Sequence, residues 1–210
     1  MSRALPLFAL TWLLSACVSV GVGENVPVQA LYLLHDAHAA APRRSAPLVP
    51  ALLIQPLPAD AMADTQSIAY SRRSHELAFY QFASWTERPL RQLPRLLQRR
   101  LEARGVAGAV GVLGEPLSAD TLLTMAVDAL YHDVAASPGQ ARFAITVELI
   151  DRRSRARLAQ RSFETTVPVA SADSAAAATA LSQAVTQTFD DLLPWLEDAL
   201  QRVPSTKTAP

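Results

Sequence analysis

A short apolar segment that ends at the only cysteine of the chain decides how much of this sequence is left to fold. Arg3 precedes a mostly apolar run, residues 4–14. That run is about half of the roughly 20 residues that a membrane-spanning helix needs. A positive charge followed by a short apolar run and small residues is typical of a secretory signal peptide. We therefore treat residues 1–16 as a signal peptide and expect the mature chain to begin at Cys17.

The cysteine itself predicts a lipid anchor. Leu14, Ser15 and Ala16 lead directly into Cys17, and this order resembles a bacterial lipobox. In such a motif the thiol takes a diacylglycerol, the signal is cut between Ala16 and Cys17, and the new amine is acylated in turn. A thiolate suits this reaction because it is a far better nucleophile than a serine hydroxyl at neutral pH. The alternative is an ordinary signal peptide followed by an unrelated cysteine.

The residues that follow the cysteine bear on location and domain limits. In enteric-type bacteria an aspartate in this place favours retention at the inner membrane, so Val18 favours the outer membrane. Residues 17–27 then form a lipidated tether, in which ten residues of extended chain reach at most about 35 Å. We expect one domain over residues 28–203 and a disordered tail over residues 204–210.

Composition excludes several classes of protein. Nineteen basic residues balance nineteen acidic ones, so no net charge favours nucleic acid as a partner. Half of the residues are hydrophobic, which is normal for a folded domain. If Cys17 carries lipid, no disulfide can form and stability must come from core packing. The phosphate-binding pattern GxxxxGK[ST] and the GxSxG elbow are both missing from the sequence, so we expect no cofactor here.

The first half of the domain is predicted as short strands around one helix. Alternation and β-branched content predict strands over residues 28–34, 48–55, 67–72, 76–82 and 106–113. Pro50 favours an edge position for the second strand, or a start after it. A leucine stripe predicts a helix over residues 86–104, capped by Thr86, kinked or tightened by Pro94 and ended by Gly105.

The second half carries clearer periodicity. Apolar and polar residues alternate over 121–133, 142–150 and 157–167, which predicts three long strands in an antiparallel meander. An alanine-rich helix over residues 172–200, with a break at Pro194, closes the domain.

The stretch from residue 53 to residue 97 carries a resemblance. An apolar strand leads through a Leu-Pro turn into a strand pair, and an aromatic segment then opens the helix. The residues that carry this order are Tyr70, Ser71, Arg72, Trp85, Glu87, Pro89 and Leu90. Together with the lipobox, the meander and the last helix, the pattern over residues 17–200 resembles the ABC-type transport auxiliary lipoprotein family. Members of that family accompany Mce-type and paraquat-inducible-type lipid transport systems.

The resemblance implies a fold and a role. The fold is a single three-layer α/β domain, with a mixed β-sheet and helices packed on its faces. The role is that of an auxiliary, non-enzymatic subunit, anchored to the outer membrane and facing the periplasm. Its partners would be an Mce-domain protein and an ABC permease with its ATPase, and the cargo a phospholipid or another lipophilic molecule. The oligomeric state is left open, with a homo-oligomer among the options.

Two other functions compete with this one. An outer-membrane lipoprotein that activates a peptidoglycan synthase would need a longer tether than ten residues supply. A periplasmic enzyme would need converging carboxylates or histidines, and their spacing in the sequence predicts no such group.

Aromatic and basic residues are the candidate contacts for a partner or for lipid. Exposed aromatic side chains are frequent binding hot spots, and arginines suit phosphates or acidic surfaces. The candidates are Tyr70, Arg72, Tyr80, Trp85 and, at the turn between the last two strands, Arg152, Arg153 and Arg155. The competing interpretation places these aromatics in the core and these arginines in a solvated turn.

The remaining polar motifs are interpreted as structural. His35 and His38 flank Asp36, but a metal needs three or four converging ligands, so we expect no metal site. The consecutive residues 74–76, Ser-His-Glu, would point in alternating directions on a strand and cannot form a triad. We interpret the arginines of the first helix as a solvated face, and Asp190 and Asp191 as a solvated or capping pair. Those arginines are Arg91, Arg95, Arg99, Arg100 and Arg104.

Overall fold

The computed structural model describes residues 28–37, 42–58 and 64–202. Its strands are β1 (Ala30–Tyr32), β2 (Val49–Pro56), β3 (Ser67–Ser71), β4 (Ala78–Trp85), β5 (Ala107–Val112), β6 (Thr121–Asp133), β7 (Gln140–Asp151) and β8 (Ala156–Pro168). Its helices are α1 (Pro89–Arg104) and α2 (Ser174–Gln201). The predicted signal peptide, Cys17, the tether and the C-terminal tail lie outside the described residues.

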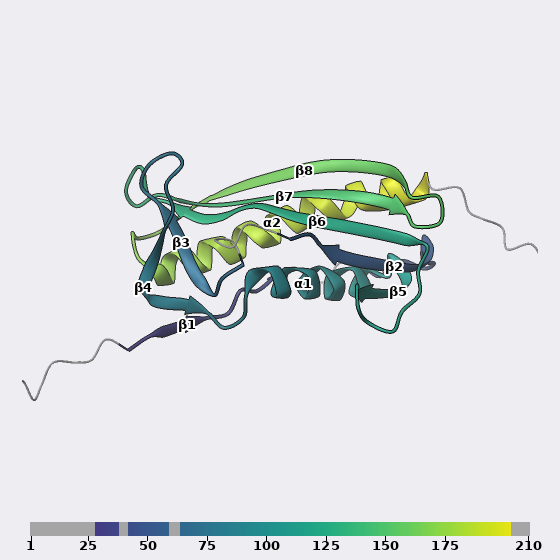
Figure 1. The fold of residues 1–210 in the computed structure, drawn as a ribbon, viewed down its shortest axis with the longest axis horizontal. Coiled ribbons are helices and arrows are strands. Elements are labelled where there is room, and N and C mark those ends of the chain that lie inside the picture. Colours follow the sequence, from purple (N-terminus) through teal and green to yellow (C-terminus); the bar gives the residue numbers. More distant parts are fainter. Residues whose placement is uncertain (1–27, 38–41, 59–63, 203–210) are drawn as a thin grey trace, which may run out of the picture.

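All eight described strands join one mixed sheet that is organised by its longest members. β6, β7 and β8 pair antiparallel in chain order. On its other edge β6 pairs in parallel with two different strands, with β2 over Thr121–Met125 and with β3 at His132–Asp133. β5 extends the sheet beyond β2, while β4 and β1 extend it beyond β3. Figure 1 shows the result: β1, β3 and β4 lie at one end of the molecule, β2 and β5 at the other, and β6–β8 connect them.

Both helices cover the same face of this sheet. Alternate residues of β7, from Ala141 to Leu149, are fully buried and share one core cluster with apolar residues of α1 and α2. The mixed sheet with packed helices agrees with the predicted α/β class. The layering differs from the three layers that the resemblance implied, because the opposite face of β7 carries Arg142, Thr146 and Glu148, which stay partly hydrated. A small second cluster on that face, around Leu53, is covered by the connection between β5 and β6.

The ends of the helices follow from local chemistry. α1 begins at Pro89, three residues later than predicted, because β4 extends to Trp85; Thr86 does not cap it, and Arg88 precedes it without a side-chain cap. Gly105 ends α1 as predicted, with a left-handed φ of 71° that glycine adopts without strain. α2 is capped by Asp173, whose carboxylate accepts the amide of Ala176 at 2.9 Å. That bond is the main reason why the pKa of Asp173 is lowered.

Two prolines, Pro50 and Pro194, behave differently from the prediction. Pro50 lies inside β2, which is an interior strand between β5 and β6. The strand tolerates it because pairing with β6 begins only at Leu52. α1 runs without interruption through Pro94, and α2 through Pro194. In α2 the buried residues Leu192 and Leu196 on either side of Pro194 hold both halves of the helix against the core.

A buried arginine, Arg100, connects both helices to the N-terminal segment. The side chain is 3% exposed, although the sequence placed it on a solvated helix face. Its Nε and Nη2 donate to the two carboxylate oxygens of Asp36 at 2.8 and 2.6 Å. Its Nη1 donates to Asp190 at 2.7 Å, and its guanidinium lies 5.7 Å from the centroid of the Phe189 ring. One residue of α1 therefore positions both the chain after β1 and the middle of α2.

A second network lies one turn further along α1. Arg104 donates to the carboxylate of Glu197 in α2 at 2.7 Å, and Arg44 reaches the same carboxylate at 3.2 Å. The solvated face predicted for α1 is thus made by Arg91, Arg95 and Arg99, which are exposed, and excludes Arg100 and Arg104.

We expect Arg100→Met to lower the free energy of unfolding by about 3 kcal/mol. The substitution keeps much of the apolar volume but takes the guanidinium away from Asp36, whose carboxylate is 3% exposed, and removing the opposite charge beside a buried carboxylate is costly. Arg99→Met is the matched control, because Arg99 is exposed on the same helix. Urea denaturation at neutral pH measures both; equal effects of the two substitutions would contradict the structural role of Arg100.

Candidate functional site

An apolar pocket lies where the sheet divides. Between Met125, the last β6 residue paired with β2, and His132, the first paired with β3, β6 has no partner strand on this edge within the described residues. The pairing of β6 with β7 is also irregular here, with a shift between Val127 and Ala129. The parallel pairs β2–β6 and β3–β6 thus lie apart along β6, and side chains instead of a paired strand fill the space between β2 and β3.

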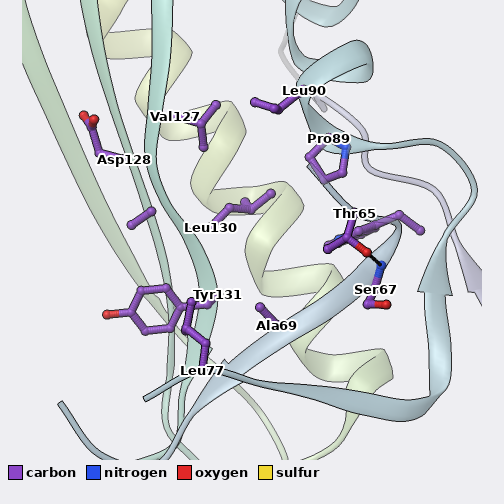
Figure 2. A pocket seen from close by; sticks show the side chains of 12 residues that line it. Thr65, Ser67, Ala69, Leu77, Pro89, Leu90, Val127, Asp128, Leu130 and Tyr131 are labelled. Atoms are coloured by element: carbon purple, nitrogen blue, oxygen red, sulfur yellow. Dashed lines mark hydrogen bonds between the residues drawn. The ribbon is translucent and has the colours of Figure 1, made fainter. Parts of the chain in front are cut away.

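The pocket is lined mainly by apolar side chains, with Thr65, Ser67, Asp128 and Tyr131 as its polar members. Figure 2 shows Val127 and Leu130 of β6 pointing toward Pro89 and Leu90 at the start of α1, whereas Asp128 points away. Ala69, Leu77 and Trp85 complete the wall from the side of β3 and β4. One of these polar groups is engaged elsewhere: Asp128 accepts from Thr146 at 2.7 Å on the outer face of the sheet.

The size of the pocket limits what it can bind. Its volume is about 160 Å³. A dry cavity of about 150 Å³ takes a molecule of the size of benzene, and small-molecule sites usually measure about 300–1,000 Å³. The pocket can therefore accept one apolar side chain or the end of an acyl chain, but it cannot enclose a whole lipid.

An open aromatic groove lies beside the pocket, at the end of the molecule that holds β3 and β4. Tyr70 and Tyr80 meet with ring centroids 5.0 Å apart, and the guanidinium of Arg72 lies 5.0 Å from the centroid of the Tyr70 ring. The loops after β6 and β8 supply the other wall of this groove, which measures about 550 Å³. Three of the residues predicted as contacts thus lie together, in an arrangement of cation and aromatic rings that suits a protein or phosphate partner.

A buried histidine fixes the position of Tyr80. His132 is fully buried, and its Nε2 lies 2.8 Å from the carbonyl oxygen of Pro138, which can only accept. Nε2 therefore carries the proton, and Nδ1 accepts the hydroxyl of Tyr80 at 2.7 Å. Burial is the main cause that raises the pKa of Tyr80, so the hydroxyl stays protonated at neutral pH. Gly139 makes room for this arrangement, because a Cβ there would collide with the carbonyl of Asp133.

The third predicted aromatic residue, Trp85, belongs to the core. Trp85 is 2% exposed and is part of the main hydrophobic cluster. Trp85 was predicted to contact a partner only if its side chain faced solvent, and the side chain is buried instead. Trp85 contributes to the site only as part of the inner wall of the apolar pocket.

The three predicted arginines of the β7–β8 turn lie at the other end of the long strands (Figure 1). Arg152 has a structural role, because its Nη1 donates to the carbonyl of Ala119 at 2.8 Å and holds the β5–β6 connection. Arg153 pairs with Asp120 at 2.8 Å, and this hydrogen bond is the main cause that raises its pKa. Both side chains of that pair are more than half exposed. Arg155 is also exposed, with a left-handed φ of 59°.

The other polar motifs do not converge. His35 is exposed near Ser182 of α2, and His38 lies outside the described residues. Residues 74–76 form an exposed turn between β3 and β4. Throughout the part of the chain that the structure describes, no three His, Cys, Asp or Glu residues gather as metal ligands. In the same residues, no helix is long and apolar enough to cross a membrane.

Sequence reasoning missed His132 and the apolar pocket. His132 falls at an alternating position of a predicted strand, and only its burial against Tyr80 distinguishes it. The pocket depends on which two strands pair with β6, and the alternation within β6 carries no signal for that choice.

We expect Tyr80→Phe to lower the free energy of unfolding by about 1–3 kcal/mol. The ring remains, but the buried Nδ1 of His132 loses its donor. Tyr70→Phe serves as the control, since it keeps the ring contact with Tyr80, and we expect an effect within about 0.5 kcal/mol. Denaturant titrations of the two variants measure this difference, and similar losses in both would contradict the assigned bond.

Comparisons with known proteins agree with this architecture. A search of curated proteins found no match to the chain. The crystal structure of protein XCC0632 from Xanthomonas campestris, described as DUF330, is 26% identical, with a TM-score of 0.72 over 82% of this chain and 97% of that chain. The crystal structure of an uncharacterized protein has a TM-score of 0.59 at 14% identity, over 80% of this chain and 99% of that chain. At this low identity, the similarity to the uncharacterized protein shows a common fold and nothing more.

The family assignment comes from a sequence profile that covers most of the domain. The profile of the ABC-type transport auxiliary lipoprotein component matches residues 32–192, from β1 into α2. The matched segment contains the apolar pocket, the aromatic groove and the arginine turn. This chain belongs to the ABC-type transport auxiliary lipoprotein component family.

Proposed function

We propose that this protein is a lipid-anchored, periplasmic subunit of the outer membrane that docks on the Mce-domain protein of an ABC-type lipid transport system. The family match over residues 32–192 carries the proposal, because an auxiliary lipoprotein is attached to a transport system without performing its ATP-driven step. The cargo class, a phospholipid or a similarly lipophilic molecule, belongs to the proposal as well.

The character of the site supports a docking role without chemistry by this subunit. The pocket at the division of the sheet is apolar, and its one carboxylate points away from it. A hydrogen bond joins Tyr80 to His132, and the ring of Tyr70 lies tilted against that of Tyr80. Aromatic rings, an arginine and a small apolar pocket are the features of a protein-binding surface, in which one side chain of the partner fills the pocket.

The shape of the molecule supports a role between membrane and partner. β1, the first described strand, lies at one end, and the turn with Arg153 and Arg155 lies at the other (Figure 1). β7 alone has 12 residues, which correspond to roughly 40 Å of extended strand. A subunit held at its N-terminal end would thus present these two arginines well away from the anchor.

The partner is tested by affinity purification of the tagged lipoprotein from envelope extract, with mass spectrometry of the proteins that copurify. We expect an Mce-domain protein and components of an ABC permease. Recovery of a peptidoglycan synthase without these partners would favour the alternative function and refute the transport role.

The arginine turn is tested in the same purification. We expect Arg153→Glu combined with Arg155→Glu to reduce recovery of the Mce-domain protein at least about tenfold, because charge reversal at a docking surface introduces repulsion. Arg91→Glu combined with Arg95→Glu is the control, since both arginines are exposed on α1 and the charge change is the same. Equal recovery with both double variants would show that the turn takes no part in docking.

The anchor is tested by Cys17→Ser. We expect the variant to lack the mass of the acyl chains and to move from the membrane fraction to the soluble periplasmic fraction, since a serine hydroxyl is a poor acceptor for the diacylglycerol. Val18→Asp keeps the cysteine, so we expect it to retain the lipid and shift toward the inner membrane. Intact-mass spectrometry and sucrose-gradient fractionation measure both effects. If the masses of the original protein and of Cys17→Ser differed only by the substituted side chain, lipidation at this residue would be refuted.

A further inference from the structure

The outer face of β1 and β4 carries a cluster of exposed apolar side chains. In β4, Ala83 and Trp85 are buried, so Phe82 and Ser84 face outward. Leu31 of β1 is opposite Ser84, which places it on the same outer face, and Leu33 follows two residues later. Leu31 is 64% exposed, Leu33 60% and Phe82 47%. Val28, which is 87% exposed and lies two residues before the start of β1, completes the group of four residues that we name the β1–β4 patch.

The patch is unusual for the edge of a sheet. Soluble proteins commonly protect an edge strand with charged residues or proline. Residues 28–34 and 77–86 contain no Asp, Glu, Lys or Arg, and their exposed polar members are uncharged. Of the seven large apolar residues that are exposed within the described chain, four belong to this patch. Single exposed apolar residues are normal, but a cluster of this kind marks a surface that is covered in use.

The position of the patch in the chain identifies what covers it. The sequence places the acylated residue at Cys17, and ten residues separate it from Val28. Ten residues reach at most about 35 Å when fully extended, so the anchoring membrane stays within this distance of β1. The tether enters the domain at Val28, which is itself part of the patch. A second copy of the chain has no comparable constraint that would hold it there.

We propose that the β1–β4 patch lies on the lipid bilayer that holds Cys17, with its side chains at the boundary of headgroups and acyl chains. This inference rests on the proposed lipid anchor. Apolar side chains that are flanked by uncharged polar groups enter this boundary, and they add to the membrane affinity of a covalent lipid. The contact sets the orientation of the subunit: the long strands lead away from the membrane, and Arg153 and Arg155 face a partner at the far end.

The test uses the mature lipoprotein in phosphatidylethanolamine–phosphatidylglycerol vesicles. The thiol of Cys17 is blocked by its diacylglycerol, so Leu33→Cys provides a single free thiol for an environment-sensitive fluorophore. Leu158→Cys is the matched control, because Leu158 is an exposed leucine of β8 beside the arginine turn. The quencher is a phospholipid that carries a nitroxide near the headgroup.

We expect the label at position 33 to shift to shorter wavelength and to lose most of its fluorescence, while the label at position 158 remains unquenched. Equal quenching of both labels, or quenching of neither, would overturn the proposal. A label at position 33 that is protected from aqueous iodide but not quenched by the lipid would also overturn it, in favour of a second copy or another protein.

Two results separate this inference from the function on which it rests. A mature chain without acyl mass would overturn both the anchor and the patch contact. Failure to recover an Mce-domain protein would refute the transport role, yet lipid quenching at position 33 would still support the membrane contact.

Discussion

The guanidinium of Arg100 is the interaction on which the arrangement of the helices depends. It lies in the core side of α1, where a charge is tolerated only with paired carboxylates. Asp36 provides two oxygens from the segment after β1, and Asp190 provides a third from α2. Three parts of the chain that are far apart in sequence must therefore meet at one point. Apolar packing alone is less directional, because hydrophobic side chains tolerate small shifts.

The pairing of β6 with two strands on one edge produces the site. β2 and β3 both run parallel to β6, but they occupy its opposite ends and leave the middle without a partner strand in the described chain. The apolar pocket occupies this interval, and the aromatic groove lies where β3 joins. The site is thus a consequence of how the sheet is divided. A binding surface formed in this way needs no catalytic group, which agrees with an auxiliary subunit of a transport system.

The two ends of the molecule differ in chemistry. At one end, β1 and β4 expose leucine and phenylalanine in two stretches, residues 28–34 and 77–86, that contain no charged residue. At the other end, the β7–β8 turn exposes Arg155 and also Arg153, which pairs with the exposed Asp120, while Arg152 holds the β5–β6 connection. The separation follows from the length of β6–β8, because strands of 12 or 13 residues keep the ends apart. A lipid surface and an acidic partner could therefore be bound at the same time.

Much of the secondary structure was predictable, because alternation and capping are local. The strands β6–β8, the glycine end of α1 and the long final helix follow from side-chain spacing and backbone preference. The residues between 70 and 90 also carry the resemblance to the family, which the sequence profile confirms. Local signals were misleading at Thr86 and Pro194, where the extension of β4 and the packing of α2 outweighed the preferences of single residues.

The sequence by itself determined the apolar faces, the turns and the balanced charge, and it supplied the lipobox-like order before Cys17, since each of these follows from residue types and their spacing. Only the tertiary structure decided that Arg100 and His132 are buried while Leu31 and Leu33 are exposed. The physical reason is that burial depends on which element packs against a residue. An arginine on a helix and a leucine on a strand have the same local pattern whether a carboxylate, a neighbouring strand or solvent lies opposite.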